Sequence, residues 1–169
     1  MAAGDRKLVY GSITAATVTL ASLATSSTKL VGRQATMINN TSTLALDYIV
    51  SGKITTGTSP TAAKSIELWV IGMLDDSIYP DAFGATDAGV TITLTEVKAS
   101  LLRLLWSTAT TNGSSLAYPF TGISLAQAFS GIVPPRFVLF VTHDTGVNLH
   151  ATAGNHVINT RPIYENVSP

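Results

Sequence analysis

The feature that most constrains the fold of this chain is a series of short Thr-, Val- and Ile-rich stretches separated by clusters of Gly, Pro, Asn and Ser. β-branched side chains lose rotamer freedom in a helix but pack well on a pleated sheet. Several stretches alternate apolar with polar or small residues, which is the period of a strand with one buried face. We therefore predict strands at residues 13–20, 43–55, 65–74, 90–94, 136–142, 146–151 and 156–164.

The spacing of these stretches favours an all-β sandwich. Turns at residues 144–146 and 153–155 are expected to join the last three strands into a meander. Residues 100–108 (SLLRLLWST) suit an amphipathic helix about as well as a buried strand, and a strand is favoured. Residues 125–129 (LAQAF) predict a helical turn capped by Ser124. With long polar loops at 56–64 and 75–89, this pattern predicts a β-sandwich and favours a jelly roll.

The chain length of 169 residues fits one domain. Residues 1–29 are weakly hydrophobic apart from the stretch at 13–20, and they are expected to form an extended N-terminal arm that contains the first strand. Residues 30–169 are expected to form the single sandwich domain. No fixed period repeats along the chain, which disfavours propellers and solenoids.

Charged residues make up only 12% of the chain, against about 25% in typical soluble proteins. A compact chain of this mass exposes roughly 8,000 Å², so charge is sparse on its surface. Such a surface carries neutral or apolar patches large enough to associate, which predicts a homo-oligomer or a place in a larger assembly. Ten basic and ten acidic residues cancel without forming a basic block, so no nucleic-acid partner is expected.

The first ten residues include Asp5 and lack an apolar core segment, so we expect no secretory signal. No apolar run reaches the eighteen or so residues of a membrane span, and no membrane partner is expected. Both features predict synthesis and folding in the cytosol. The chain has no cysteine, which removes disulfides, thiolate metal sites and cysteine nucleophiles.

The sequence favours a binding protein over an enzyme. It contains no G-x-S-x-G elbow for a serine nucleophile, and neither of the glycine-rich motifs that cradle nucleotide phosphates. The best catalytic alternative is a cupin-like metal enzyme with His143, His150 and His156 as ligands. Because Asp144 and the histidines flank turns at spacings that match no ligand motif, structural histidines are favoured, and no metal or cofactor is expected.

The loop at residues 75–87 gathers carboxylates of the kind that bind calcium. Their spacing is not that of an EF-hand, and a solvated acidic loop that protects a strand edge is the favoured interpretation. The four carboxylates are Asp75, Asp76, Asp81 and Asp87.

Loops at one end of a sandwich are where carbohydrate sites of this class lie. The candidate binding residues are Tyr79, Asp81, Tyr118 and His143. Trp69 and Trp106 lie within apolar stretches and are expected in the core instead.

Residues 134–167 (PPRFVLFVTHDTGVNLHATAGNHVINTRPIYENV) resemble the C-terminal ends of small structural proteins from tailed bacteriophages. The shared pattern is an apolar strand, an Asp-Thr-Gly turn, a polar strand, a Gly-Asn turn and a closing strand. In size, neutral charge and composition the chain is similar to phage head decoration (cement) proteins. That resemblance implies a virion protein on the capsid surface that binds the major capsid protein or other virion subunits, commonly as a homotrimer. The alternative function is a carbohydrate- or receptor-binding jelly-roll module of a phage fibre or spike.

Overall fold

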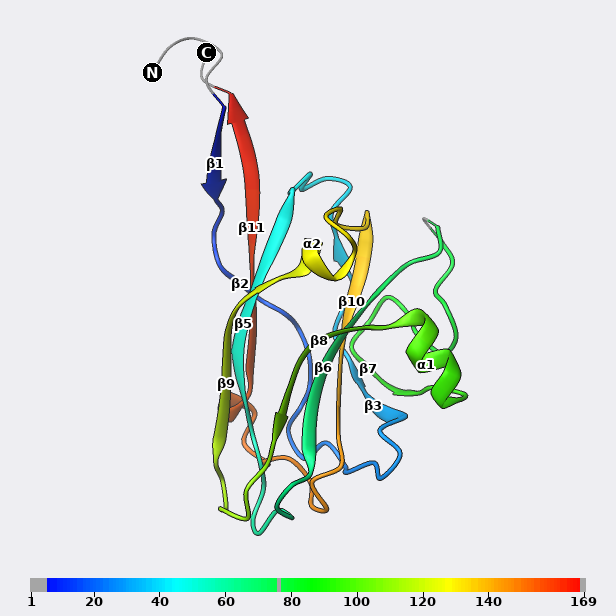
Figure 1. Ribbon diagram of the computed structural model, residues 1–169, viewed down its shortest axis with the longest axis vertical. Coiled ribbons are helices and arrows are strands. Elements are labelled where there is room, and N and C mark those ends of the chain that lie inside the picture. The colour runs from blue at the N-terminus through cyan, green and yellow to red at the C-terminus, as the bar shows by residue number, and fades with distance from the viewer. Residues whose placement is uncertain (1–5, 76, 168–169) are drawn as a thin grey trace.

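The computed structural model describes residues 6–75 and 77–167, and it shows an all-β sandwich of two antiparallel sheets packed face to face (Figure 1). The five-stranded sheet, here sheet A, has the order β1 (Arg6–Tyr10), β11 (Val157–Val167), β5 (Asp47–Thr55) and β9 (Ala117–Ser124), with β2 (Thr14–Ala15) also paired to β11. The six-stranded sheet, here sheet B, has the order β7 (Ala88–Thr91), β3 (Val31–Gln34), β10 (Arg136–His143), β6 (Ser65–Gly72) and β8 (Arg103–Ala109), with β4 (Ile38–Asn39) also paired to β10.

Strand β10 is buried on both faces, which explains its unbroken apolar sequence. Phe137, Leu139 and Val141 point into the main core between the two sheets. Val138 and Phe140 point the other way, into a second core that the segment from Phe83 to Leu102 closes. Sheet B is therefore covered on both faces over part of its area, whereas sheet A has one covered face.

The described residues also form three short helices: α1 (Thr95–Leu101), α2 (Leu125–Ala128) and the 3₁₀ turn η1 (Ala153–Asn155). Helix α2 confirms the predicted helical turn, because the Ser124 hydroxyl accepts a hydrogen bond from the Gln127 amide at 3.2 Å. Within the described residues, no helix combines the length and the apolar character that a bilayer crossing requires.

Four of the predicted strands are confirmed as β5, β6, β10 and β11. The strand predicted at 90–94 corresponds to β7, which begins and ends earlier in the chain. The predicted strand at 146–151 is wrong. Its backbone amides bond to separate segments, with Leu149 donating to Leu23 and His150 to Thr55, so no single ladder forms. The predicted meander is wrong for the same reason, since this segment carries the chain from β10 in sheet B to β11 in sheet A.

Strands β1, β3, β4 and β9 were not predicted, and in β3 and β9 glycine and proline interrupt the pattern. Pro119 is tolerated in β9 because that strand lies at the edge of sheet A. Gly32 is required in β3, since a Cβ there would collide with the Val141 carbonyl oxygen. The ambiguous segment at 100–108 is confirmed mainly as strand β8, with helix α1 ending just before it.

The described part of the N-terminal segment follows the edge of sheet A. Strand β1 pairs with the end of β11, and the two form a ribbon that projects beyond the body of the sandwich (Figure 1). Further along, the amides of Gly11 and Ala16 continue the contact with β11 by donating to Pro162 and Ile158. Beyond this, the chain enters the main core, where Leu20 is 2% exposed. Of the predicted strand at 13–20, only β2 forms.

Candidate functional site

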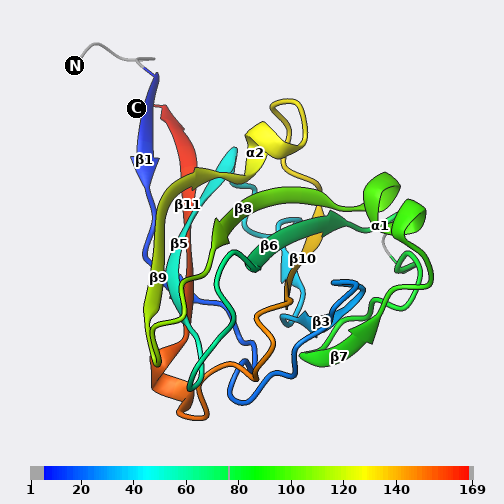
Figure 2. The ribbon, with the colours of Figure 1, turned by 60° about the horizontal axis from the view of Figure 1, so that its bottom comes forward.

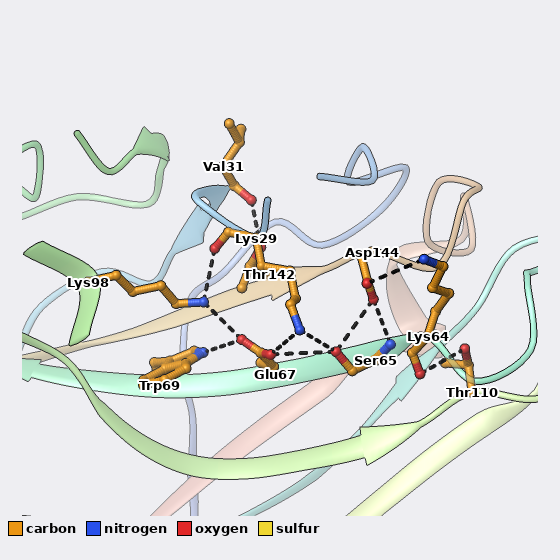
Figure 3. Close-up of polar contacts among 10 residues, drawn as sticks. All are labelled: Lys29, Val31, Lys64, Ser65, Glu67, Trp69, Lys98, Thr110, Thr142 and Asp144. Atoms are coloured by element: carbon orange, nitrogen blue, oxygen red, sulfur yellow. Dashed lines mark hydrogen bonds and ion pairs between the residues drawn. The ribbon is translucent and has the colours of Figure 1, made fainter. Parts of the chain in front are cut away.

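In the described chain, a cluster of hydrogen bonds and ion pairs surrounds Glu67 of β6, on the face of sheet B that α1 covers (Figure 3). Its carboxylate lies 2.9 Å from Lys98 Nζ of α1 and 2.7 Å from Lys29 Nζ. The indole of Trp69 donates a third hydrogen bond to it at 2.8 Å. Glu67 is 8% exposed and Lys98 is 7% exposed, so this is a buried ion pair.

The pKa values of this cluster follow from burial and pairing. Burial, the largest single influence, acts to raise the pKa of Glu67, but hydrogen bonds from Lys29, Lys98 and Trp69 together leave it lowered. The pKa of Lys98 is lowered because burial of its ammonium outweighs the attraction of Glu67. Perturbed groups of this kind occur at catalytic sites as well as in structural ion pairs.

The partners of Lys98 favour the structural role. Its ammonium also donates to the Lys29 carbonyl at 3.0 Å and lies 4.4 Å from the centre of the Trp69 ring. Each donor direction is therefore occupied by the protein. The cluster holds α1 against sheet B, and its members are too far apart in the sequence for any motif to reveal them.

A second group of polar contacts ties the ends of β6 and β10 together (Figure 3). Asp144 accepts a hydrogen bond from the Ser65 amide at 2.6 Å, and Lys64 Nζ lies 4.0 Å from its other oxygen. Thr142 donates to the Val31 carbonyl at 2.7 Å, which joins β10 to β3. These contacts satisfy the polar groups at the strand ends.

The ring nitrogens of His143 and His156 lie within hydrogen-bond distance of other protein groups. His143 is fully buried, with Nδ1 3.0 Å from the Thr145 hydroxyl and Nε2 3.1 Å from the Leu23 carbonyl. His156 Nε2 lies 2.8 Å from the His150 carbonyl. The described residues contain no group of three His, Asp or Glu side chains that could hold a metal ion.

The acidic loop disperses its carboxylates. Asp75 accepts hydrogen bonds from the amides of Ser77 and Ile78, both at 2.7 Å. Asp87 pairs with Arg33 of β3 at 2.6 Å. Asp76 lies outside the described residues.

The four residues predicted as a binding loop do not come together. Tyr79 and Asp81 share the loop between β6 and β7, where the Tyr79 hydroxyl contacts Met37 Sδ and Asp81 accepts from Thr93. Tyr118 lies in sheet A with its side chain against the main core, and its hydroxyl accepts from the Thr111 amide at 2.9 Å. His143 lies in sheet B, where burial removes it from any surface ligand.

A hollow of about 470 Å³ opens between the two sheets beside the N-terminal segment. Its aromatic walls are Tyr48 and Tyr164, and hydroxyl side chains such as those of Ser12, Thr17 and Thr36 surround them. No charged residue lines it. A smaller hollow of about 250 Å³ lies on the outer face of sheet A and is lined in part by Ile13, Ile49 and Arg161.

The outer face of sheet A and the β1–β11 ribbon expose apolar side chains. Tyr164 of β11 points toward the main core, so its neighbour Ile163 points outward. Tyr10 of β1 is paired with Ile163 and therefore points outward too. Leu8 lies two residues along on the same outward face. Leu8 is 66% exposed and Tyr10 is 63% exposed. This surface was not predicted, because only strand pairing shows which apolar residues lack a covering layer.

No protein-family model, curated protein or solved structure matches this chain.

Proposed function

We propose that this chain is a bacteriophage structural protein of the head decoration (cement) class. It binds the outside of the assembled shell, at the capsid surface, through the major capsid protein or other virion subunits. It acts as a homo-oligomer, with a trimer favoured, and adds buried contact area without catalysing a reaction. A jelly-roll strand order is part of this proposal, and the two-sheet sandwich is compatible with it.

The observation that supports this proposal is the projecting ribbon. Leu8 and Tyr10 expose apolar surface there, on a part of the molecule that the body of the sandwich does not cover (Figure 1). In the described chain, β1 pairs with β11 alone, so its other edge is open. An open edge beside apolar side chains is suited to adding a strand or loop of a neighbouring protein.

Co-sedimentation with undecorated shells, assembled from the major capsid protein of the same genome, tests this function. We expect the full chain to pellet with shells, and the double variant Leu8→Ser/Tyr10→Ser to bind at least about tenfold more weakly. Ile132→Ser is the matched control, because Ile132 is also highly exposed but lies in the connection after α2. A full chain that stays in the supernatant at saturating shell concentration contradicts the proposal.

The 470 Å³ hollow favours a second candidate function, a carbohydrate- or receptor-binding module of a phage fibre or spike. Its volume lies within the usual range of about 300–1,000 Å³ for small-ligand sites. Tyrosine rings surrounded by uncharged hydroxyls match the apolar faces and hydroxyl groups of a neutral sugar. A glycan array probed with a multivalent form tests this function, and Tyr164→Ala is expected to remove any signal. An array without signal contradicts it.

A further inference from the structure

We infer that the hollow of about 250 Å³ on the outer face of sheet A is a binding site for a carboxylate group. The guanidinium of Arg161 is the cation that anchors the carboxylate, and uncharged polar side chains beside it supply further hydrogen bonds. This site goes beyond the proposed shell-binding role and does not depend on it. The side chains that form it are those of Ile13, Ile49, Ser51, Thr121, Asn159 and Arg161.

An irregularity in the ladder between β5 and β9 lies at the hollow. The register shifts so that one residue of β5, Ser51, faces two residues of β9, Thr121 and Gly122. Gly122 has a φ of +71°, in the left-handed region that glycine adopts without strain. Such a bulge interrupts the ladder and bends the strand, and β9 curves toward α2 in Figure 2. The ladder is therefore open at the point where Ser51 and Thr121 line the hollow.

The polar side chains of the hollow belong to the outward face of sheet A. Val50 and Ile158 are buried in the main core, so their neighbours Ser51 and Asn159 point outward. Ser51 and Asn159 lie directly opposite each other in the β5–β11 ladder. Arg161 is two residues beyond Asn159 and points to the same side. Strand pairing thus places a hydroxyl, an amide and a guanidinium around one hollow.

The protein itself does not use these polar groups. In the part of the chain that the structure describes, the side chains of Ser51, Thr121 and Asn159 make no hydrogen bond. Arg161 has neither a hydrogen bond nor an ion pair there, and its Nε is buried without a partner. Buried polar groups in native proteins nearly always have a partner, so an unpaired one indicates a group that binds there.

Apolar side chains flank Arg161 on both sides. Ile49 is its direct partner in the β5–β11 ladder. Ile13 immediately precedes β2, which pairs with the other side of β11. Both isoleucines line the hollow and keep water from the stem of the arginine. An ion pair with this guanidinium is therefore screened less by water than one on an open surface.

The charges near the hollow favour a carboxylate over a phosphate. The hollow itself is lined by one cation and by no carboxylate. Asp47 lies on the next outward pair of the β5–β11 ladder, and its hydrogen bonds from neutral groups leave its negative charge in place. A phosphate carries up to about two negative charges, so it would need a second cation and would be repelled more strongly by Asp47. A carboxylate has a single charge and two oxygens that match the fork of Arg161.

The size of the hollow limits what carries the carboxylate. Its volume of about 250 Å³ lies below the usual range of about 300–1,000 Å³ for small-molecule sites, so it suits one sugar ring or one acidic side chain. The amide of Asn159 and the hydroxyls of Ser51 and Thr121 can bond to the polar groups next to the carboxylate. An acidic sugar and an acidic side chain of another protein present this same group, and the experiment distinguishes them.

Nuclear magnetic resonance of the Arg161 Nε–H group in the full chain tests this site. Glucuronate presents the carboxylate on a sugar, and N-acetylglutamate presents it on an amino acid. Glucose and N-acetylglutamine are the matched neutral compounds. We expect at least one of the two carboxylates to shift the Arg161 signal saturably, and the neutral compound of the same pair to leave it unchanged.

Variants of the site are compared through the side-chain amide signal of Asn159. Arg161→Gln is expected to raise the dissociation constant at least about tenfold, because it removes both the charge and the fork. Ser51→Ala changes no hydrogen bond of the described chain and is expected to raise the dissociation constant about threefold, which tests the site should Arg161→Gln disturb the fold. Lys53→Gln is the matched control, because Lys53 is an exposed cation of β5 outside the hollow, and we expect a change below about twofold.

The outcomes separate the two carriers and can overturn the site. Saturable binding of glucuronate alone assigns the carboxylate to a sugar, and binding of N-acetylglutamate, alone or with glucuronate, assigns it to an acidic side chain. Either result upholds the site. No saturable shift with either carboxylate, equal shifts with the neutral compounds, or binding that Arg161→Gln leaves unchanged would each overturn the inference. Shell co-sedimentation is a separate measurement, so a failure here leaves the proposed function standing.

Discussion

Lys98 of α1 and Glu67 of β6 form an ion pair in which Nζ lies 2.9 Å from Oε2 and both residues are more than nine-tenths buried. The pair joins a short helix to the face of sheet B across 31 residues of sequence. Helix α1 has no side-chain N-cap, so tertiary contacts rather than its own termini hold it in place. The position of α1 on sheet B depends on this attachment.

Glu67→Gln is expected to destabilise the protein by about 3–5 kcal/mol, because it leaves the Lys98 ammonium buried without a counter-charge. Urea unfolding measures the loss. The double variant Glu67→Leu/Lys98→Met should lose much less, since it removes both charges together. A loss below about 1 kcal/mol for Glu67→Gln would show that the buried pair contributes little.

Stability is expected to fall as the pH is lowered through about 6.5. Burial lowers the pKa of both His143 and His156 from the ordinary value of 6.5. The unfolded chain therefore binds protons at a higher pH than the folded chain does, and the stabilising contribution is complete only above 6.5.

Urea unfolding at about pH 8 and about pH 5.5 measures this dependence, within a window that stays above the titration of the carboxylates. His143→Gln should reduce the difference between the two values. An equal free energy of unfolding at both pH values would contradict the prediction.

Gly32→Ala is expected to destabilise the protein by about 2 kcal/mol or more, because the added Cβ meets the Val141 carbonyl oxygen and the Phe140 ring. Gly89→Ala is the matched control, since Gly89 lies in the adjacent strand β7 with nothing within 4 Å of its Cβ position. Thermal unfolding of the two variants checks the contrast. Equal melting temperatures would mean that β3 and β10 can separate at little cost.

Ser124→Ala is expected to cost about 1–2 kcal/mol, since the hydroxyl both caps α2 and donates to Asp47 of β5 at 2.6 Å. Ser12→Ala serves as the control, because no hydrogen bond of the exposed Ser12 side chain is seen in the described chain. Denaturant unfolding compares them. If Ser124→Ala is neutral, the cap is not holding the turn between β9 and α2.

The sequence by itself determined the fold class and the most regular strands. β-branched alternation identified β5, and the continuous apolar run identified β10, whose side chains are buried whichever face they occupy. The cap at Ser124 was also readable, because capping depends on residues only three positions apart. Each of these features depends on residues that are close together in the sequence.

The tertiary structure alone decided which strands share a sheet, because ladders join segments that are distant in the chain. The segment after His143 looks like a strand, but its amides bond to Leu23 and Thr55, and it therefore carries the chain between the sheets. Pairing likewise decided that Leu8 and Tyr10 are exposed on a ribbon, and burial decided that His143 is not a surface ligand. Glu67 and Lys98 gain their perturbed pKa values only when folding removes water from both, and no local pattern of residues encodes that.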